Sequence, residues 1–262
     1  MIKVVSWNVN SLRVRLPQVM DWLAQHRPDI LGLQETKMTD PDFPAASFEE
    51  AGYRVVFSGQ KTYNGVAIIS KARVEDCLTD PSNLEDPQRR ILATTCGGVR
   101  VINLYVPNGA EVGSDKYAYK LDWLGKVRAF IGDELARHQN LVVLGDFNIA
   151  PEDRDVYDPD AWREKILCST PEREAFQGLL GLGLADTFRL FDQPEDSYSW
   201  WDYRAAGFRR NHGLRIDHVL VSPALRALCL SCRIDVEPRK LERPSDHAPV
   251  VAEFDAHLEP AV

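Results

Sequence analysis

The sequence predicts an α/β fold in which two β-sheets stack face to face and helices cover their outer sides. Apolar segments of strand length alternate with helical segments along the chain, and no linker or low-complexity tract separates them. A strand that leads to Asn8 in the first half is echoed by a strand that leads to Asp146 and Asn148 in the second half. Two similar stacked sheets would explain this echo and would bring the polar strand ends together. We therefore expect residues 1–262 to form one domain.

The first half of the chain is rich in predicted strands. Runs of apolar and β-branched residues predict strands at 2–8, 29–35, 53–58, 65–70, 91–96 and 99–105. Gly97-Gly98 predicts a tight hairpin between the last two strands. A helix is expected after the first strand, where apolar residues recur at helical spacing. These residues are Leu16, Val19, Met20 and Leu23. A shorter helix is expected over 43–51, closed by Gly52.

The second half carries the longer helices. A helix is expected over 116–138, and its apolar side is interrupted by Arg128, where Val127 is expected to point inward instead. The other apolar positions of this side are Tyr117, Leu121, Leu124, Ile131 and Leu135. The next helix is expected to begin with Thr170 as its N-cap and Pro171 as its first helical residue. Strands are expected near 141–147, 197–202, 216–221, 228–236 and 248–254.

Composition narrows the class of protein. The chain has 262 residues, of which 44% are hydrophobic, enough to bury a sizeable core without disulfides. The five cysteines form no even framework, and Cys229-x-x-Cys232 lacks a second pair at zinc spacing. Reduced thiols are therefore expected, as in a cytoplasmic protein. The sequence shows neither an apolar run of membrane-span length nor a signal-peptide pattern.

The charge balance has two interpretations. A formal net charge of −8 argues, taken alone, against a nucleic-acid partner. Carboxylates gathered around a metal would concentrate negative charge locally, while basic loop residues gather on another face. Any one of those basic residues also fits scattered solubilising charge. They are Arg13, Arg15, Lys37, Lys61, Arg89, Arg90, Lys116, Lys120, Arg204, Arg209, Arg210 and Arg215.

The strongest local signal is the segment Val142–Asn148, an apolar strand that stops on Asp146 and Asn148. These two residues are two positions apart, so on a continuing strand both would point to the same face. A turn-forming Asp and Asn before Pro151 is the alternative interpretation. Two polar groups on one buried face are costly unless they are satisfied, so we favour a functional site.

Other strands bring similar groups to their ends. Asn8 and Glu35 each end an apolar strand, Asp217 lies inside a strand that runs on to Val221, and Asp246-His247 precedes the last strand. Carboxylate and amide oxygens suit Mg²⁺ or Mn²⁺, and a neighbouring imidazole suits chemistry on a phosphate ester. Considered alone, Glu35 would be interpreted as a solvated strand end, and Asp246-His247 would be interpreted as a turn or a cap.

Two pairings are expected among these residues. Lys37 follows Glu35 closely enough to pair with it and to hold its orientation. Asp217 is flanked by apolar residues, and a buried acid needs a partner, for which His247 is the natural candidate. Tyr105, considered alone, is an ordinary strand aromatic.

Taken together and in order, these segments resemble the exonuclease III family of Mg²⁺-dependent DNA-repair nucleases, which includes abasic-site endonucleases. The likeness runs nearly end to end, and the bacterial branch is the closer one. The matching segments are Trp7–Asn10, Leu33–Lys37, Asn64–Ala67, Asn103–Gly109, Gly145–Asn148, Trp201–Arg204, Gly213–Asp217 and Ser245–Pro249.

The resemblance implies a four-layer α/β sandwich, two stacked mixed β-sheets flanked by helices, with the site at one end. It implies Mg²⁺, or Mn²⁺ in its place, double-stranded DNA as partner, and a monomer. The implied metal ligands are Glu35 as the main one, with Asn8, Asp146, Asn148, Asp246 and His247 nearby. Asp146 would deprotonate the attacking water, and Asn148 would hold that water or the phosphate. His247, paired with Asp217, would contact the scissile phosphate, and Tyr105 would assist the leaving group.

The resemblance also implies the substrate: duplex DNA cleaved 5′ to abasic sites and at blocked 3′ ends. Trp200, Leu214 and Ile216 would wall a pocket for the damaged sugar; ordinary core is the alternative for them. Backbone phosphates would be contacted by Arg13, Asn108, Lys116, Lys120, Arg209 and Arg215. The sequence leaves open the balance of endonuclease, 3′ exonuclease and 3′ phosphatase activities, the number of metal ions, and activity on RNA. A phosphoesterase acting on inositol phosphates or phospholipid heads, and a non-catalytic nucleic-acid-binding regulator, are the alternatives.

Overall fold

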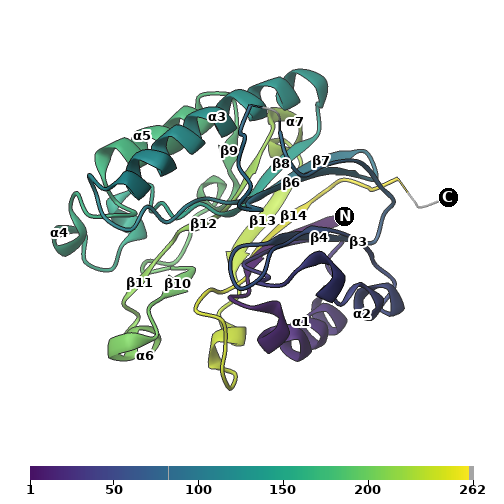
Figure 1. The fold of residues 1–262 in the computed structure, drawn as a ribbon, viewed down its shortest axis with the longest axis horizontal. Coiled ribbons are helices and arrows are strands. Elements are labelled where there is room, and N and C mark those ends of the chain that lie inside the picture. Colours follow the sequence, from purple (N-terminus) through teal and green to yellow (C-terminus); the bar gives the residue numbers. More distant parts are fainter. Residues whose placement is uncertain (82, 260–262) are drawn as a thin grey trace.

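The computed structural model describes residues 1–81 and 83–259. Two six-stranded sheets stack face to face, and helices cover both outer sides (Figure 1). Helices α1 (Leu12–His26) and α2 (Ala45–Glu50) lie on one side, and α3 (Asp115–Arg137) and α5 (Thr170–Leu180) lie on the other. The four-layer α/β sandwich is therefore confirmed.

The first sheet has the strand order β13-β14-β1-β2-β4-β3. Its strands are β1 (Ile2–Asn8), β2 (Ile30–Gln34), β3 (Arg54–Ser58), β4 (Val66–Ser70), β13 (Cys229–Ile234) and β14 (Val250–Phe254). Strands β1 and β2 are parallel, and the other neighbours are antiparallel, so the sheet is mixed.

The second sheet has the strand order β5-β6-β7-β8-β12-β9 and is mixed as well, because β7 and β8 are parallel. Its strands are β5 (Val74–Leu78), β6 (Ile91–Cys96), β7 (Val99–Tyr105), β8 (Leu141–Asp146), β9 (Ala185–Asp186) and β12 (Asp217–Val221). The edge strands β5 and β9 were not expected. β5 is exposed in its central residues and lacks an apolar run, and β9 is only two residues long.

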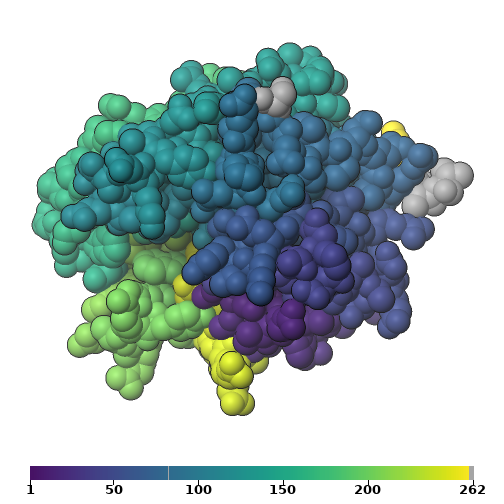
Figure 2. All heavy atoms as spheres, in the orientation of Figure 1, coloured from purple at the N-terminus to yellow at the C-terminus, as the bar shows by residue number. Residues whose placement is uncertain are grey.

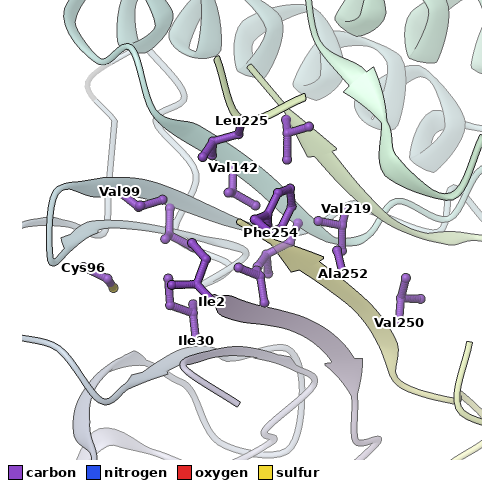
Figure 3. Packing of buried hydrophobic residues seen from close by; sticks show 14 of the residues in the cluster. Ile2, Ile30, Cys96, Val99, Val142, Val219, Leu225, Val250, Ala252 and Phe254 are labelled. Atoms are coloured by element: carbon purple, nitrogen blue, oxygen red, sulfur yellow. The ribbon is translucent and has the colours of Figure 1, made fainter. Parts of the chain in front are cut away.

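The main core lies between the two sheets. Figure 3 shows Ile2, Ile30 and Phe254 of the first sheet packed toward Val142 and Val219 of the second. Alternate residues of each strand face the helices instead; Trp7 of β1, for example, packs with α1. Because both faces of the central strands are buried, the sequences of these strands are continuous apolar runs.

Two helix details differ from expectation. On α3, Val127 points inward and Arg128 is exposed as expected, but Leu121 and Leu135 are only half-buried. The core side is instead formed by Trp123, Leu124, Val127, Phe130 and Ile131. The N-cap of α5 is Ser169 rather than Thr170, because Ser169 and Glu172 form a capping box.

Two segments project below the sandwich (Figures 1 and 2). The first contains the small sheet of β10 (Trp200–Trp201) and β11 (Gly213–Leu214) with α6 (Gly207–Arg210) between them. The second is the yellow loop around η5 (Glu237–Lys240) that leads to Asp246 and β14. The remaining short helices are η1 (Asp40–Asp42), η2 (Asp153–Asp155), α4 (Pro159–Trp162), η3 (Thr187–Leu190), η4 (Arg204–Ala206) and α7 (Pro223–Arg226). Within the described ranges, no helix has the length and apolarity needed to cross a membrane.

Candidate active site

The predicted site residues converge at one edge of the sandwich. Strands β1, β2, β7 and β8 all end there, and β12 and β14 begin there. In the second sheet, Tyr105 of β7 is level with Asp146 of β8, and Asp146 is level with Asp217 of β12. A bridge between Trp200 and His247 brings the loop before β14 to the same place. The register therefore places three of the expected catalytic groups side by side, and His247 joins them through its contact with Asp217.

Asn8 joins the two sheets at this edge. Its side-chain nitrogen donates to Glu35 Oε1 and to Asp146 Oδ2, both at 2.9 Å. Its side-chain oxygen accepts from the backbone N–H of Asn10 at 2.9 Å. Because a backbone N–H can only donate, this last bond fixes the amide orientation. Asn8 therefore presents hydrogens, not an oxygen, to the Glu35 and Asp146 carboxylates.

His247 is held by Asp217, as expected. The imidazole Nδ1 lies 2.8 Å from Asp217 Oδ2, and that carboxylate accepts a further bond of 2.7 Å from the Ser199 hydroxyl. Burial alone would lower the pKa of His247, but the carboxylates of Asp217, Asp146 and Asp246 outweigh burial and raise this pKa well above its usual value. The imidazole is therefore positively charged at neutral pH. Ser199 was not anticipated from the sequence.

Asp146 is the central acid. Its Oδ2 lies 3.7 Å from His247 Nε2. Burial raises the pKa of Asp146 above its usual range; His247 opposes this shift, and the carboxylates of Asp217 and Glu35 add to it. A carboxylate whose pKa is raised in this way is better suited to accept a proton near neutral pH.

Asn148 reaches the site through a turn. The strand ends at Asp146, and the backbone N–H of Asn148 donates to Asp146 Oδ1 at 2.9 Å. Asn148 itself has a φ of +48°, in the left-handed region. The argument from a continuing strand was therefore wrong, and the backbone turns after Asp146, as in the alternative interpretation. The Asn148 amide donates to Val106 O at 2.9 Å and accepts from Asn108 at 3.3 Å.

Glu35 and Lys37 pair as expected, with Lys37 Nζ 3.0 Å from Glu35 Oε2. Asn10 extends this group: it accepts from Lys37 and donates to Asp246 Oδ1 at 2.9 Å. The indole N–H of Trp200 donates to the other Asp246 oxygen at 3.0 Å. Asn10 was not singled out from the sequence, although it lies two residues after Asn8 in the same motif.

Tyr105 keeps its proton at the site. Burial, followed by the carboxylates of Glu35 and Asp146, raises the pKa of its phenol well above the ordinary value. The guanidinium of Arg90 lies over the Tyr105 ring at 4.8 Å and holds it in place. A protonated phenol beside carboxylates is suited to donate a proton or a hydrogen bond.

The donor set fits a divalent cation. Glu35, Asp146 and His247 each offer one ligand atom, and these atoms lie within 4.8 Å of one another. Because His247 is protonated, the two carboxylates are the better ligands; hard oxygens of this kind suit Mg²⁺ or Mn²⁺. Burial of several carboxylates at one point also leaves negative charge that a cation would neutralise. The Asp246 carboxylate lies outside this three-residue group.

Two of the residues expected to contact DNA are buried instead. The side chain of Lys120 is 0% exposed and pairs with Glu172. Arg215 is 1% exposed and pairs with Asp155 at 2.7 Å and Asp186 at 2.8 Å. Neither cation can reach a phosphate outside the protein, so the expectation that they bind the DNA backbone is wrong.

The other expected contact residues lie at the surface. Arg13, Asn108, Lys116 and Arg209 are exposed. Asn108 and Lys116 line a hollow of about 420 Å³, together with Arg90 and several amide and tyrosine side chains. Among the described residues that line it, none is acidic. Such a lining suits an anion even though the protein as a whole is acidic.

The three residues expected to wall a sugar pocket pack together. Leu214 and Ile216 are buried in one cluster with Val156 and Leu167, and Trp200 is half-buried against it. Leu214 and Ile216 are therefore core residues beneath Trp200. Trp200 is the member of the three with an accessible surface.

A stacked pair of mixed sheets that presents carboxylates, amides, a phenol and a charged imidazole at one edge defines a hydrolase of phosphate esters. The model of the Endonuclease/Exonuclease/phosphatase family matches residues 5–247 of the chain. The sequence is 38% identical to exodeoxyribonuclease III of Haemophilus influenzae, over 97% of this chain and 100% of that protein. It is 32% identical to an exodeoxyribonuclease of Bacillus subtilis, over 95% of this chain and 98% of that protein.

Solved structures show the same likeness. A 3′ phosphatase from Neisseria (NExo), bound to a product DNA hairpin, superposes with a TM-score of 0.96 at 54% identity and covers 98% of this chain and 100% of its own. An AP endonuclease from Archaeoglobus fulgidus gives a TM-score of 0.94 at 40% identity, and the match covers 98% of this chain and 100% of that one. The chain belongs to the exonuclease III / AP endonuclease branch of this family, and it is a phosphodiester-hydrolysing nuclease of that type.

Proposed function

We propose that the protein is a Mg²⁺-dependent DNA-repair nuclease that cleaves duplex DNA 5′ to abasic sites and processes blocked 3′ ends. The observation that carries the proposal is the position of Asp146. This buried acid lies between Glu35, to which Asn8 links it, and the charged His247–Asp217 pair. A proton acceptor, a cation site and a fixed positive charge are the groups that phosphodiester hydrolysis requires.

Each of these residues has a separate role in the proposed reaction. Asp146 accepts the proton of the attacking water, and Asn148 orients that water or a phosphate oxygen. The His247 imidazolium, held by Asp217, stabilises the negative charge that develops on the phosphate oxygens. Tyr105 donates its proton to the departing 3′ oxygen as the P–O bond breaks. Glu35, with Asp146 beside it, would hold Mg²⁺, which neutralises charge on the phosphate when it is bound.

The proposed substrate is supported by the relatives and by Trp200. The relatives are named as exodeoxyribonucleases, an AP endonuclease and a 3′ phosphatase. A damaged nucleotide must turn out of the duplex to be reached, which costs least where the base is missing. The accessible Trp200 offers a surface for the exposed sugar. The 54% identity to the Neisseria 3′ phosphatase supports processing of 3′ ends in particular.

Several further properties belong to this proposal. We propose a single catalytic domain, since the two sheets share one core between them. The protein would act as a monomer in the cytoplasm. Reduced thiols suit that compartment, and all five cysteines are free in the structure.

The direct test is cleavage of synthetic duplexes that carry an abasic site, an intact recessed end or a 3′ phosphate, each with and without Mg²⁺. We expect metal-dependent cleavage of at least the abasic and 3′-phosphate substrates. Release of phosphate from inositol phosphates without cleavage of DNA would favour the lipid-type phosphoesterase. DNA binding without any hydrolysis would favour the regulator.

A mutational test locates the chemistry. Glu35→Ala and Asp146→Ala should each reduce kcat by about 10³-fold or more, because each removes a charged group from the reacting centre. Binding to an abasic duplex should persist in both variants, as measured by fluorescence anisotropy. Retained turnover in either variant would contradict the assignment of these roles.

A further inference from the structure

Lys120 lies behind the catalytic edge, between α5 and the loops that follow β7 and β8. It is on the first part of α3, and its side chain is wholly buried. Its ammonium donates to the backbone oxygen of Asn148 at 2.7 Å and to that of Asn108 at 3.1 Å, and it pairs with the Glu172 carboxylate on α5. An ammonium has three donors, and here each has its own acceptor.

The two carbonyls belong to the loops that carry the Asn148 amide, which is proposed to take part in the reaction, and the Asn108 amide, which is expected to contact a phosphate. Asn108 follows β7, which ends at Tyr105, and Asn148 follows β8, which ends at Asp146. The side chains of these two asparagines are also bonded to each other. One ammonium therefore ties together the loops that follow the neighbouring parallel strands β7 and β8, which end at Tyr105 and Asp146.

The backbone at Asn148 needs such support. Its φ of +48° lies in the left-handed region, which asparagine tolerates better than most residues with a side chain but which surrounding contacts must still select. The bond from Lys120 to the Asn148 carbonyl fixes the peptide plane that follows this residue. The amide of Asn148 is thereby held toward Val106 and Asn108.

Glu172 is itself fixed, so the ammonium cannot shift. Its carboxylate accepts from the backbone N–H groups of Leu167 and Ser169, both at 3.1 Å, and from the Ser169 hydroxyl at 2.6 Å. These bonds cap the start of α5. The position of Lys120 is thus set by α3 on one side and by the N-terminus of α5 on the other.

We propose that Lys120 is a positioning residue for the nuclease reaction, which holds Asn108 and Asn148 in the geometry required for turnover. The inference rests on the proposed function, since it concerns the same active site. It differs from a purely structural role, in which the ion pair would stabilise the fold and leave the rate of the chemical step alone.

Single removal of Lys120 would leave Glu172 charged and buried, and the protein would be strongly destabilised. The informative variant is therefore the double substitution Lys120→Met/Glu172→Gln, which removes both charges. A matched control exists in the second buried ion pair of α3, between Arg100 and Glu134, whose side chains are 4% and 2% exposed. Arg100 lies on β7, five residues before Tyr105, or about 17 Å away along the strand. The control variant is Arg100→Met/Glu134→Gln.

We expect the kcat of Lys120→Met/Glu172→Gln on an abasic duplex to fall by about 10- to 100-fold, with KM within about three-fold of the parent value. The Arg100→Met/Glu134→Gln control should keep kcat within about two-fold of the parent value. This holds even if its melting temperature falls as much as that of the Lys120→Met/Glu172→Gln variant. A Lys120→Met/Glu172→Gln variant with normal kcat would overturn the proposal, as would an equal loss of kcat in the Arg100→Met/Glu134→Gln control.

Hydrogen exchange provides a readout that does not depend on activity. Amides in the loops 106–111 and 147–151 should exchange faster in Lys120→Met/Glu172→Gln than in the parent, and those loops should be unchanged in the Arg100 control. Unchanged exchange would overturn the proposal even if the protein proved not to cleave DNA. A double variant that stays unfolded at low temperature would also overturn it, because Lys120 would then be needed by the whole fold.

Discussion

At the scale of single residues, the site is governed by which groups carry charge. The buried Asp217 carboxylate touches Nδ1 of His247, and Asp146 lies beyond Nε2. Three carboxylates close to one imidazole keep it protonated despite its burial. The sequence predicted the Asp217–His247 pair because a buried acid needs a partner. The charge on the imidazole depends on Asp146 and Asp246 as well, which reach it through folding.

Asp217→Asn tests this charge. The substitution removes the nearest carboxylate, so the pKa of His247 should fall and the alkaline limb of the pH–rate profile should move to lower pH. At neutral pH, kcat should drop by about 10²- to 10³-fold, because the positive charge that stabilises the phosphate is partly lost. The control is Asp29→Asn, at the opposite end of the first sheet, where the carboxylate caps the backbone of Lys3. An unshifted alkaline limb in Asp217→Asn would contradict this explanation.

The pKa of His218 is shifted in the opposite direction to that of His247. Its Nδ1 faces the Arg215 guanidinium at 3.0 Å, and its Nε2 faces the Ile149 carbonyl at 2.9 Å. Arginine can only donate and a carbonyl can only accept, so the ring must be neutral with its hydrogen on Nε2. Burial first, then Arg215, lowers the pKa of His218 from 6.5 to about 4.

This lowered pKa predicts a loss of stability in acid. The unfolded chain binds the proton below pH 6.5, whereas the folded protein resists it until about pH 4. The contribution is therefore fully present above pH 6.5, and about 3 kcal/mol is lost as the pH falls to 4. Urea unfolding at several pH values measures it. His218→Gln, which can keep both hydrogen bonds, should remove this share of the pH dependence; an unchanged pH dependence would count against the assignment.

At the scale of elements, β8 delivers Asp146 because of Gly145. This glycine has a φ of +152°, and a Cβ added there would lie 1.9 Å from the backbone oxygen of Leu104 on β7. The close approach of the two parallel strands therefore requires a residue without a side chain. The apolar run and the Gly-Asp ending were visible in the sequence, but the reason for the glycine was not, because Leu104 lies on another strand.

Gly145→Ala should lower the free energy of unfolding by about 2–4 kcal/mol and should also reduce kcat, since β8 must shift and move Asp146 with it. Chemical denaturation and steady-state kinetics measure the two effects. Gly125→Ala on α3 is the matched control, because a Cβ there meets nothing within 4 Å. That control should raise stability by about 0.5–1 kcal/mol. Equal effects of the two substitutions would refute the packing argument.

The elements also show where local patterns stop being informative. The long strands and the Gly97-Gly98 hairpin followed from alternation and turn chemistry, which act between near neighbours in the sequence. β5 was missed because its exposed central residues, including Glu75 and Asp76, carry no apolar signal. The N-cap of α5 was placed one residue late for a different reason: the capping-box pattern of Ser169 and Glu172 was present in the sequence but was not used.

At the scale of the whole molecule, an acidic chain presents a surface that suits an anion. The formal net charge is −8, yet the described residues that line the hollow beside the site include Arg90 and Lys116 and no acid. Many of the carboxylates that set the net charge lie elsewhere or are buried at the active site. Net charge was therefore a poor guide to the partner.

Lys116 and Arg137 provide a test of this distribution, because they lie near opposite ends of α3, about 32 Å apart. Lys116→Ala should weaken binding to duplex DNA and reduce the salt dependence of the affinity by about one counterion, since Lys116 lies beside the site. Arg137→Ala should change neither property. Fluorescence anisotropy across a range of salt concentrations measures both. Identical salt slopes for the two variants would show that this hollow does not contact the DNA backbone.

By itself, the sequence determined the order of the long strands and helices, the two-sheet architecture and the polar groups at the strand ends. These features depend on alternation, turn residues and motif spacing, which are properties of short segments. Tertiary structure alone decided that Lys120 and Arg215 are buried, that Asn8 offers its N–H groups, and that His247 is charged. Each of these outcomes depends on partners far away in the chain, such as Glu172 for Lys120 or Asp146 for Asn8. Burial and charge at a site are set by the neighbours that folding supplies, and a local pattern does not contain them.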